Sequence, residues 1–207
     1  VYGAEKKTSG KVMVHGMEVN IRHPADAIQA GVMFCSEDRK AEGIVPVRLV
    51  LENINISARR LHSFLGCIIN PAWEWKNATD YIAQLGIKTP GPNQQIVNLS
   101  GGNQQKAILA RWLSEDMKVI LLDEPTRGID VGAKNEIYSI MYKLSERGIG
   151  VVMISSDLPE VMGASDRILV MRQGGVVAEF AKKDASEEKI LKWALPAEKG
   201  VKEEKAS

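Results

Sequence analysis

The sequence predicts an α/β protein whose mostly parallel β-sheet has flanking helices, an inserted helical subdomain and a small antiparallel β element. Short apolar runs of the kind that forms buried strands alternate with helical stretches. The strand-like runs are 119–122, 150–154 and 168–171, and the helical stretches between them are 132–147 and 158–163. Strands that alternate with helices are typical of a parallel sheet covered on both faces. The pattern from Val50 to about residue 86 is helical, which predicts the insertion.

The first predicted elements are a hairpin and a short helix. Strand-like runs at 11–15 and 17–21 lie on either side of Gly16, which predicts the small antiparallel element. Pro24 is expected to open a helix, because proline favours the first helical position, and Gly31 is expected to end it.

The central part of the chain predicts a buried strand and then the insertion. The run Val32–Cys35 has the composition of a buried strand and leads into a charged loop at 36–40, a common way to build a site. We expect one domain over residues 1–197, with the helical subdomain at about 50–115 inside it. The charged, apolar-poor tail at 198–207 is expected to be unstructured.

Composition is that of an ordinary globular protein. The 207 residues are 44% hydrophobic and 26% charged, and 27 Lys and Arg nearly balance 26 Asp and Glu. This balance argues against a nucleic-acid partner. No apolar run approaches the roughly 20 residues that span a bilayer, and no leader pattern opens the chain, so we expect any membrane anchor to belong to another subunit. Cys35 and Cys67 lack metal-ligand spacing and are expected to be buried thiols.

A Ser-Gly-Gly sequence comes just before a strongly helical stretch at 103–114. It places a hydroxyl and bare backbone amides, those of Ser100, Gly101 and Gly102, at a helix N-terminus. Such an end carries partial positive charge and amides without helical acceptors, so it binds phosphate well. Taken alone, the Ser-Gly-Gly sequence favours an ordinary capped helix.

Two adjacent carboxylates end the strand-like run at 119–122. The carboxyl ends of parallel strands open into a ligand crevice, and Asp123 and Glu124 stand there. One carboxylate at such a position suits Mg²⁺, usually through water, and the other can polarise an attacking water. Taken alone, the sequence Asp123-Glu124-Pro125 also fits an acidic turn, which is the alternative interpretation.

Together and in this order, these motifs resemble those of ABC-type ATPases. The sequence LSGGNQQ at 99–105 resembles their signature, 119–124 their Walker B strand and 128–130 their D-loop. Finer resemblance runs through 37–43, 52–57 and 126–134. These stretches are similar to the second, C-terminal ATPase half of the double-headed subunit of monosaccharide importers, and most closely to the arabinose importers.

The resemblance covers nearly the whole chain and implies what it does. It implies an ABC ATPase domain with ATP and Mg²⁺ as cofactors, in which hydrolysis drives sugar uptake. The residues expected to bind the nucleotide are Ser100, Gly101, Gly102, Gln104, Glu37 and Asp130. Asp123 is expected to bind the metal, and Asp123, Glu124 and Ser156 are the expected catalytic residues.

Two residues depart from the usual ABC pattern. Glu37 stands where these ATPases usually carry the Gln that touches magnesium, water and the permease. Ser156 stands at the position of the His that usually contacts the γ-phosphate. Serine can donate a hydrogen bond but cannot carry the imidazolium charge. We therefore expect this half to be the weaker hydrolytic centre.

The 207 residues contain no phosphate loop of the form G-x-x-x-x-G-K-[S/T]. The nearest imitation, Gly10-Lys11, has Glu5 where the first glycine belongs and Val12 in place of the magnesium-binding hydroxyl. We expect the sequence to be a fragment that is truncated at its N-terminus before residue 1. A charge-assisted phosphate contact contributes roughly 1.5–3 kcal/mol, so the isolated chain is expected to bind nucleotide poorly and to hydrolyse it negligibly.

The resemblance also implies partners and a location. The expected partners are the first ATPase half of the same subunit, the membrane permease and, indirectly, a periplasmic sugar-binding protein. The expected location is the cytoplasmic face of the cell membrane, peripherally bound. Two alternatives stay open: a soluble ABC ATPase that acts on nucleic acid or ribosomes, and a half that only braces an active partner. The ATPase does not contact the sugar, so the sugar's identity rests on the resemblance alone.

Overall fold

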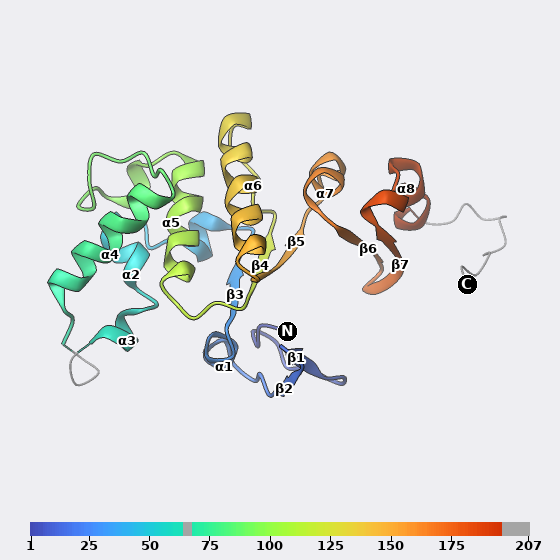
Figure 1. Ribbon diagram of the computed structural model, residues 1–207, viewed down its shortest axis with the longest axis horizontal. Helices are drawn as coiled ribbons and strands as arrows, with labels where there is room; N and C mark the ends of the chain where they lie inside the picture. Colours follow the sequence, from blue (N-terminus) through green and yellow to red (C-terminus); the bar gives the residue numbers. More distant parts are fainter. Residues whose placement is uncertain (64–67, 196–207) are drawn as a thin grey trace. The chain divides into compact units, whose positions relative to one another are not determined.

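The computed structural model describes residues 1–63 and 68–195, in two compact units, Val1–Ile154 and Ser155–Ser207 (Figure 1). The first unit contains, in chain order, β1 (Val12–Val14), β2 (Met17–Val19), α1 (Pro24–Gln29), β3 (Val32–Cys35), the π-helical turn η1 (Arg39–Gly43), α2 (Val50–Asn55), α3 (Arg59–His62), α4 (Pro71–Gln84), the 3₁₀ turn η2 (Ile96–Asn98), α5 (Gly101–Leu113), β4 (Val119–Asp123), α6 (Val131–Glu146) and β5 (Gly150–Ile154). The second contains α7 (Leu158–Ala164), β6 (Arg167–Arg172), β7 (Gly175–Ala181), η3 (Lys182–Asp184) and α8 (Glu187–Ala194).

The first unit has the predicted parallel sheet and the predicted small antiparallel element. Its three strands run in the order β3-β4-β5, with Cys35 opposite Leu122 and Asp123 opposite Ile154. The hairpin pairs β1 with β2 in antiparallel register. The predicted α/β class with a parallel sheet and a small antiparallel element is therefore confirmed.

Strand β4 is the centre of the sheet and has apolar neighbours on both faces. Ile120 and Leu122 are fully buried in the main core, which includes Leu109 of α5 and Ile137 of α6. The alternate residues of β4 pack instead against a smaller cluster around Val14. Because side chains alternate along a strand, β4 packs against apolar residues on both faces. This packing fixes the position of its last residue, Asp123.

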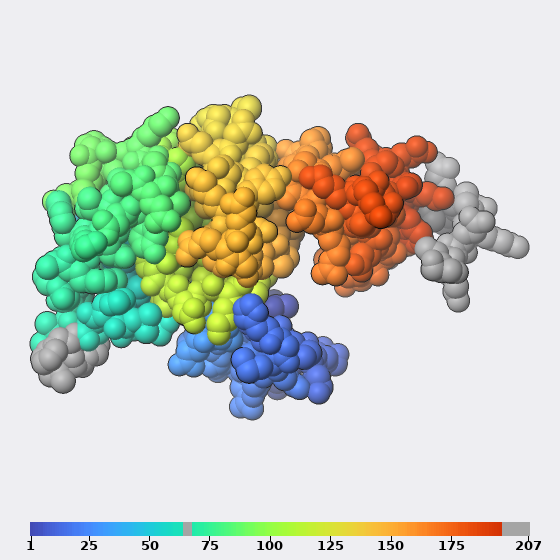
Figure 2. Space-filling view, viewed as in Figure 1, coloured from blue at the N-terminus to red at the C-terminus, as the bar shows by residue number. Residues whose placement is uncertain are grey.

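The helices that follow β3 form a compact group. Helices α2, α4 and α5 contact one another, and α5 also contacts β3 and α6. The Asn70 side chain caps α4 by accepting hydrogen bonds from two backbone amides of its first turn. Figure 2 shows this part of the chain densely packed. The helices and the sheet share one core, so the boundary predicted for the subdomain at about 50–115 stays a prediction.

The second unit corrects one sequence prediction. The run 168–171 was expected to continue the parallel sheet, but β6 instead pairs antiparallel with β7. The reason is the turn between them, where Gln173 has φ 52° and Gly174 has φ 81°. Two consecutive positive φ angles favour a tight hairpin that returns the chain at once. Helix α8 was not predicted. Its N-cap is Ser186, whose side chain accepts a hydrogen bond from the Lys189 amide.

The cysteine prediction is confirmed only for Cys35. Its thiol is 2% exposed, and burial raises its pKa to about 12. Cys67 and the tail at 198–207 lie outside the described residues.

Candidate functional site

The carboxyl ends of β3, β4 and β5 lie at one edge of the sheet in the first unit. Asp123 is the last residue of β4, and it is aligned with Ile154 of β5. The loop at 36–40 follows β3 directly, and its Glu37 lies two residues after the strand ends at Cys35. The sheet thus brings the loop with Glu37 to the edge where Asp123 and Glu124 stand, as its parallel direction requires.

Glu124 has a strained backbone. Its φ angle is 45°, in the left-handed region that residues other than glycine seldom adopt. Two hydrogen bonds hold it there: its amide donates to the Ile154 carbonyl at 2.9 Å, and its carbonyl accepts from the Arg127 amide at 3.1 Å. Such conformations cost about 1–3 kcal/mol and cluster at functional sites. The sequence carries no signal for this strain, because glutamate is not typical of positive φ.

Asp123 carries an electrostatic penalty of its own. Burial, and secondarily the negative charge of Glu124, raise the pKa of its carboxyl above the ordinary value. A site that disfavours the ionised form of its own carboxylate is suited to bind a cation. Within residues 1–63 and 68–195, no group of three or more His, Cys, Asp or Glu side chains is arranged to hold a metal ion. Mg²⁺ fits nevertheless, because it is usually held by one or two carboxylates together with phosphate oxygens and waters.

Two arginines, Arg39 and Arg127, connect this edge of the sheet to the start of α5. Glu37 forms an ion pair with Arg127 of the turn after β4. Arg39 donates from Nη1 to the Arg127 carbonyl at 3.5 Å, a long contact. Its Nη2 lies 2.8 Å from the position that a Cβ on Gly101 would occupy. Three segments that are far apart in the sequence therefore meet, and sequence reasoning did not find this meeting.

The Ser-Gly-Gly sequence does stand at a helix N-terminus, as predicted. Ser100 is the N-cap of α5, and its Oγ accepts from the Asn103 side-chain amide at 2.8 Å, which leaves its own O–H able to donate. A Cβ on Gly102 would lie 2.6 Å from the Cβ of Ala133 in α6. The glycines thus have a packing role: Gly102 is buried and Gly101 partly exposed, while Ser100 is exposed at the helix start.

Two other predicted nucleotide ligands have structural tasks. Gln104 is 4% exposed, and its side-chain amide donates to the Ile96 carbonyl at 3.3 Å, so it lies inside the core. Asp130 is the N-cap of α6, and its Oδ1 accepts from the Ala133 amide at 2.9 Å. Their contact with nucleotide stays a prediction. So does the role of Ser156, which belongs to the second unit.

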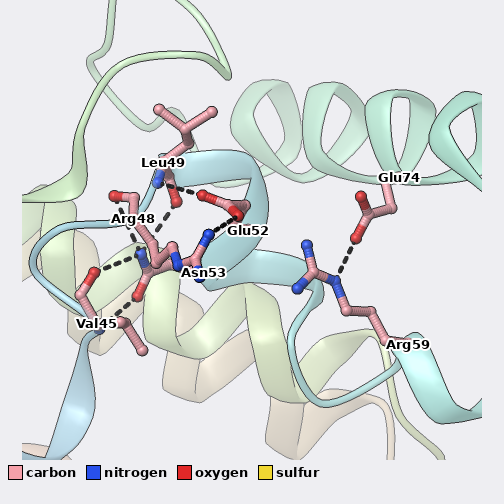
Figure 3. Close-up of polar contacts among 7 residues, drawn as sticks. All are labelled: Val45, Arg48, Leu49, Glu52, Asn53, Arg59 and Glu74. Atoms are coloured by element: carbon pink, nitrogen blue, oxygen red, sulfur yellow. Dashed lines mark hydrogen bonds and ion pairs between the residues drawn. The ribbon is translucent and has the colours of Figure 1, made fainter. Parts of the chain in front are cut away.

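A groove of about 520 Å³ lies beside α2 in the first unit. Its lining residues are Val45, Arg48, Glu52, Asn53, Ile56, Arg59 and Ile69. Asn53 organises one wall: its Oδ1 accepts from the Val45 amide at 2.8 Å, and its Nδ2 donates to the carbonyls of Val45 and Leu49 at 3.1 and 3.0 Å (Figure 3). Arg59 pairs with Glu74 of α4 at 2.5 Å between Nε and Oε1. Only the resemblance at 52–57 pointed to this region in the sequence.

A comparison with protein families gives one match, to the family described as "ABC transporter", over residues 1–127. This range is more than half of the chain and contains the Ser100 helix start, Asp123 and Glu124. The chain belongs to the ABC transporter family.

Known proteins resemble this ABC transporter chain over most of its length. The "Arabinose import ATP-binding protein AraG" of Yersinia pestis is 60% identical over 195 residues, which are 94% of this chain and 37% of that protein. The protein of the same name from Escherichia coli O6:H1 is 58% identical over 196 residues, 95% of this chain and 39% of that protein. The chain thus spans less than two-fifths of the length of these relatives.

Solved structures support the ABC cassette fold. The cassette MJ1267 aligns with a TM-score of 0.77 at 21% identity, covering 94% of this chain and 80% of that one. The dimeric cassette MJ0796, described as bound to ADP and Pi, aligns with a TM-score of 0.70 at 22% identity, covering 86% and 75%. At these identities the likeness concerns the fold of the ABC chain alone. Among its described residues, none of the helices has the length and apolar character needed to cross a bilayer.

Proposed function

We propose that this chain is part of the ATP-hydrolysing subunit of an ABC importer for arabinose or a similar monosaccharide. The observation that carries the proposal is the pair of carboxylates at the carboxyl end of β4, where Glu124 is held at φ 45° beside Asp123. The arabinose-import names of relatives at 58–60% identity support the sugar class. The near-zero net charge argues against a nucleic-acid partner.

Asp123 and Glu124 have separate roles in this proposal. When bound, ATP would supply the phosphoryl group that is transferred to water, and Mg²⁺ would offset the negative charge of its phosphates. Asp123 would hold the cation, whose positive charge would favour the ionised carboxylate that burial, and secondarily Glu124, disfavour. Glu124 orients the attacking water and accepts its proton, and its fixed backbone aims the carboxylate in advance. Glu37 completes this site less effectively than the glutamine it replaces, and a catalytic part for Ser156 stays what the family resemblance implies.

The start of α5 serves a second nucleotide. Ser100, Gly101 and Gly102 present a hydroxyl and open amides at a helix N-terminus, which suits the phosphates of ATP held by the first ATPase half of the same subunit. The positive charge of Arg39, whose Nη2 lies beside Gly101, favours the same anion. Glu37 and Asp130 flank this region, with Gln104 supporting it from the core. By itself the chain is expected to bind nucleotide weakly.

The groove beside α2 is the surface that we propose for the permease, which carries the membrane anchor and receives sugar from a periplasmic binding protein. Ile56 and Ile69, 44% and 40% exposed, line it together with Arg48 and Arg59. Apolar side chains edged by two ion-paired arginines, Arg48 with Glu52 and Arg59 with Glu74, suit a short helix of a membrane subunit that has both apolar and polar side chains. In this proposal the chain works at the cytoplasmic face of the membrane.

The test is the ATPase activity of the intact subunit with its permease in membranes, with arabinose and the binding protein added or withheld. We expect hydrolysis that depends on Mg²⁺ and rises when arabinose is present. Hydrolysis that ignores permease and sugar but responds to RNA or ribosomes would support the soluble alternative instead. Titration of the isolated chain with ATP is the companion measurement, and saturation at micromolar ATP would contradict its weak binding.

A further inference from the structure

Arg111 is an unusual buried cation in the first unit. It lies near the end of α5, its side chain is 9% exposed, and burial lowers its pKa. None of the ion pairs formed within residues 1–63 and 68–195 includes it. A buried charge without a counter-ion is costly, and a Leu or Met of similar length would avoid that cost. Position 111 therefore requires the directional hydrogen bonds that a guanidinium can donate and an apolar side chain cannot.

The guanidinium makes directional contacts with one residue. Arg111 Nε donates to the Asn53 carbonyl at 2.9 Å, and Nη2 lies 3.5 Å from Asn53 Oδ1. Asn53 is in the last turn of α2 and is 1% exposed. Carbonyls in the last helical turn lack helical donors, and Arg111 supplies a donor from another helix.

Asn53 is the residue that shapes the groove wall. It holds the backbone of Val45 through both a donated and an accepted hydrogen bond, and it also binds the Leu49 carbonyl (Figure 3). Glu52 completes the wall by accepting from the Leu49 amide at 2.9 Å. A displacement of this wall would also displace Asn53, because both the side chain and the backbone carbonyl of Asn53 are hydrogen-bonded.

Helix α5 connects Arg111 to the Ser-Gly-Gly start. The helix is continuous from Gly101 to Leu113. With a rise of about 1.5 Å per residue, Arg111 lies about 15 Å along the axis from Gly101. A regular helix of this length moves as a rod, so its two ends are mechanically linked.

We propose that Arg111 is a positioning residue that ties the groove wall, through Asn53, to the helix whose N-terminus faces the nucleotide. A permease helix that moves the wall would then move Gly101 and Gly102. This inference rests on the proposed function, because it takes the groove as the permease site and the start of α5 as a nucleotide site.

The first test uses the isolated chain and depends on no function. In Arg111→Met the Val45 amide, whose acceptor is Asn53 Oδ1, should exchange its hydrogen roughly tenfold faster or more, because local opening becomes easier. Arg111→Lys should restore part of the protection. Arg147→Met is the matched control, since Arg147 is exposed on α6. Unchanged exchange at Val45 in Arg111→Met would overturn the inference.

The second test uses the intact subunit. Arg111→Met should lose roughly tenfold or more of the stimulation by permease and sugar, while hydrolysis without permease stays within about twofold of wild type. Arg147→Met should keep both. If wild type shows no sugar-stimulated hydrolysis, the proposed function has failed. If wild type is stimulated and Arg111→Met is equally stimulated, only the inference has failed. If Arg111→Met loses stimulated hydrolysis and hydrolysis without permease equally, with unchanged folding, the inference is also contradicted. In that case Arg111→Lys should not selectively restore the stimulation.

Discussion

Glu37 forms an ion pair with Arg127, and this contact joins the loop after β3 to the turn after β4. The carboxylate that replaces the usual glutamine is thus bound to the segment that also carries Glu124. Both side chains are largely exposed, at 46% for Glu37 and 66% for Arg127. Their contact is therefore expected to contribute little to stability.

Glu37→Gln should lower the free energy of unfolding of the isolated chain only slightly. Exposed ion pairs contribute about 0.2–1 kcal/mol. A double-mutant cycle with Arg127→Gln, measured by urea unfolding, should give a coupling energy in this range. The coupling should fade at about 1 M salt, where charges are screened within about 3 Å. A coupling energy several times larger, or one that ignores salt, would contradict the exposed geometry.

Gly102→Ala should destabilise the chain because of the close approach of α5 to α6. The new Cβ would lie 2.6 Å from the Ala133 Cβ. Overpacking of this kind costs about 1–3 kcal/mol, against about 0.5–1 kcal/mol gained from the better helix propensity of alanine. The measurement is urea unfolding.

Gly132→Ala is the matched control for this prediction. Gly132 is the second residue of α6, as Gly102 is of α5, and its nearest neighbour is the Asp130 side chain at 3.3 Å. The contacted atom is Asp130 Oδ1, which also caps α6, but at 3.3 Å it has to move only slightly, so this variant should lose much less stability than Gly102→Ala. Equal stabilities for the two variants would show that the helices do not meet as described.

Sequence reasoning located most elements but not their long-range relations. The strands Val32–Cys35 and Gly150–Ile154 have the predicted bounds, because each is a compact apolar run next to a glycine turn. Helix α5 starts at Gly101, two residues before the predicted helix at 103–114, because the glycines join the helix rather than precede it. Local pattern was sufficient for these elements.

Pairing and strain were beyond local pattern. The periodicity of residues 168–171 is the same for a parallel and an antiparallel strand, and the positive φ angles of Gln173 and Gly174 form the hairpin that pairs β6 with β7. The Glu37–Arg127 contact spans distant positions, and the positive φ of Glu124 is held by one hydrogen bond to Ile154 of β5 and one from Arg127 in its own turn. The candidate site was therefore predicted by residue type and order, while its geometry was not.

Asp123→Asn should stabilise the isolated chain at pH 7. The pKa of Asp123 is raised in the folded state, so its neutral form is favoured there. Below the unfolded-state pKa of about 3.9 both states are protonated, and this contribution to stability is fully present. As pH rises through the raised pKa, the folded state must hold a disfavoured charge and stability is lost. Asparagine removes that charge.

The measurement is the free energy of unfolding of both forms at pH 7 and pH 4. The advantage of Asp123→Asn should be larger at pH 7. Asp116→Asn is the control, because the Asp116 side chain is 94% exposed, and it should change little at either pH. An Asp123→Asn variant that is less stable than wild type at pH 7 would contradict the electrostatic penalty at this site. In the intact transporter the same variant should lose the Mg²⁺ ligand, so stability and function should move in opposite directions.

Ser100→Arg and Glu124→Gln should differ sharply in the intact subunit with its permease. Ser100 is exposed at the start of α5, so an arginine there leaves the fold intact but fills the surface that faces nucleotide on the first ATPase half. We expect turnover to be abolished. In the proposed division of labour Glu124→Gln alters only the weaker site, where Glu37 replaces the usual Gln, and a large part of turnover should remain.

The two variants test the division of labour only if both fold normally, which thermal unfolding of each checks. Loss of a general base commonly costs about 10²- to 10⁴-fold in rate. If Glu124→Gln fell by that amount, the site beside β4 would be a principal hydrolytic centre, and the strained backbone of Glu124 would then serve catalysis in this half directly. If instead only Ser100→Arg is inactive, the strain at Glu124 is retained in a site of minor turnover, and the start of α5 is the part of this chain on which hydrolysis depends.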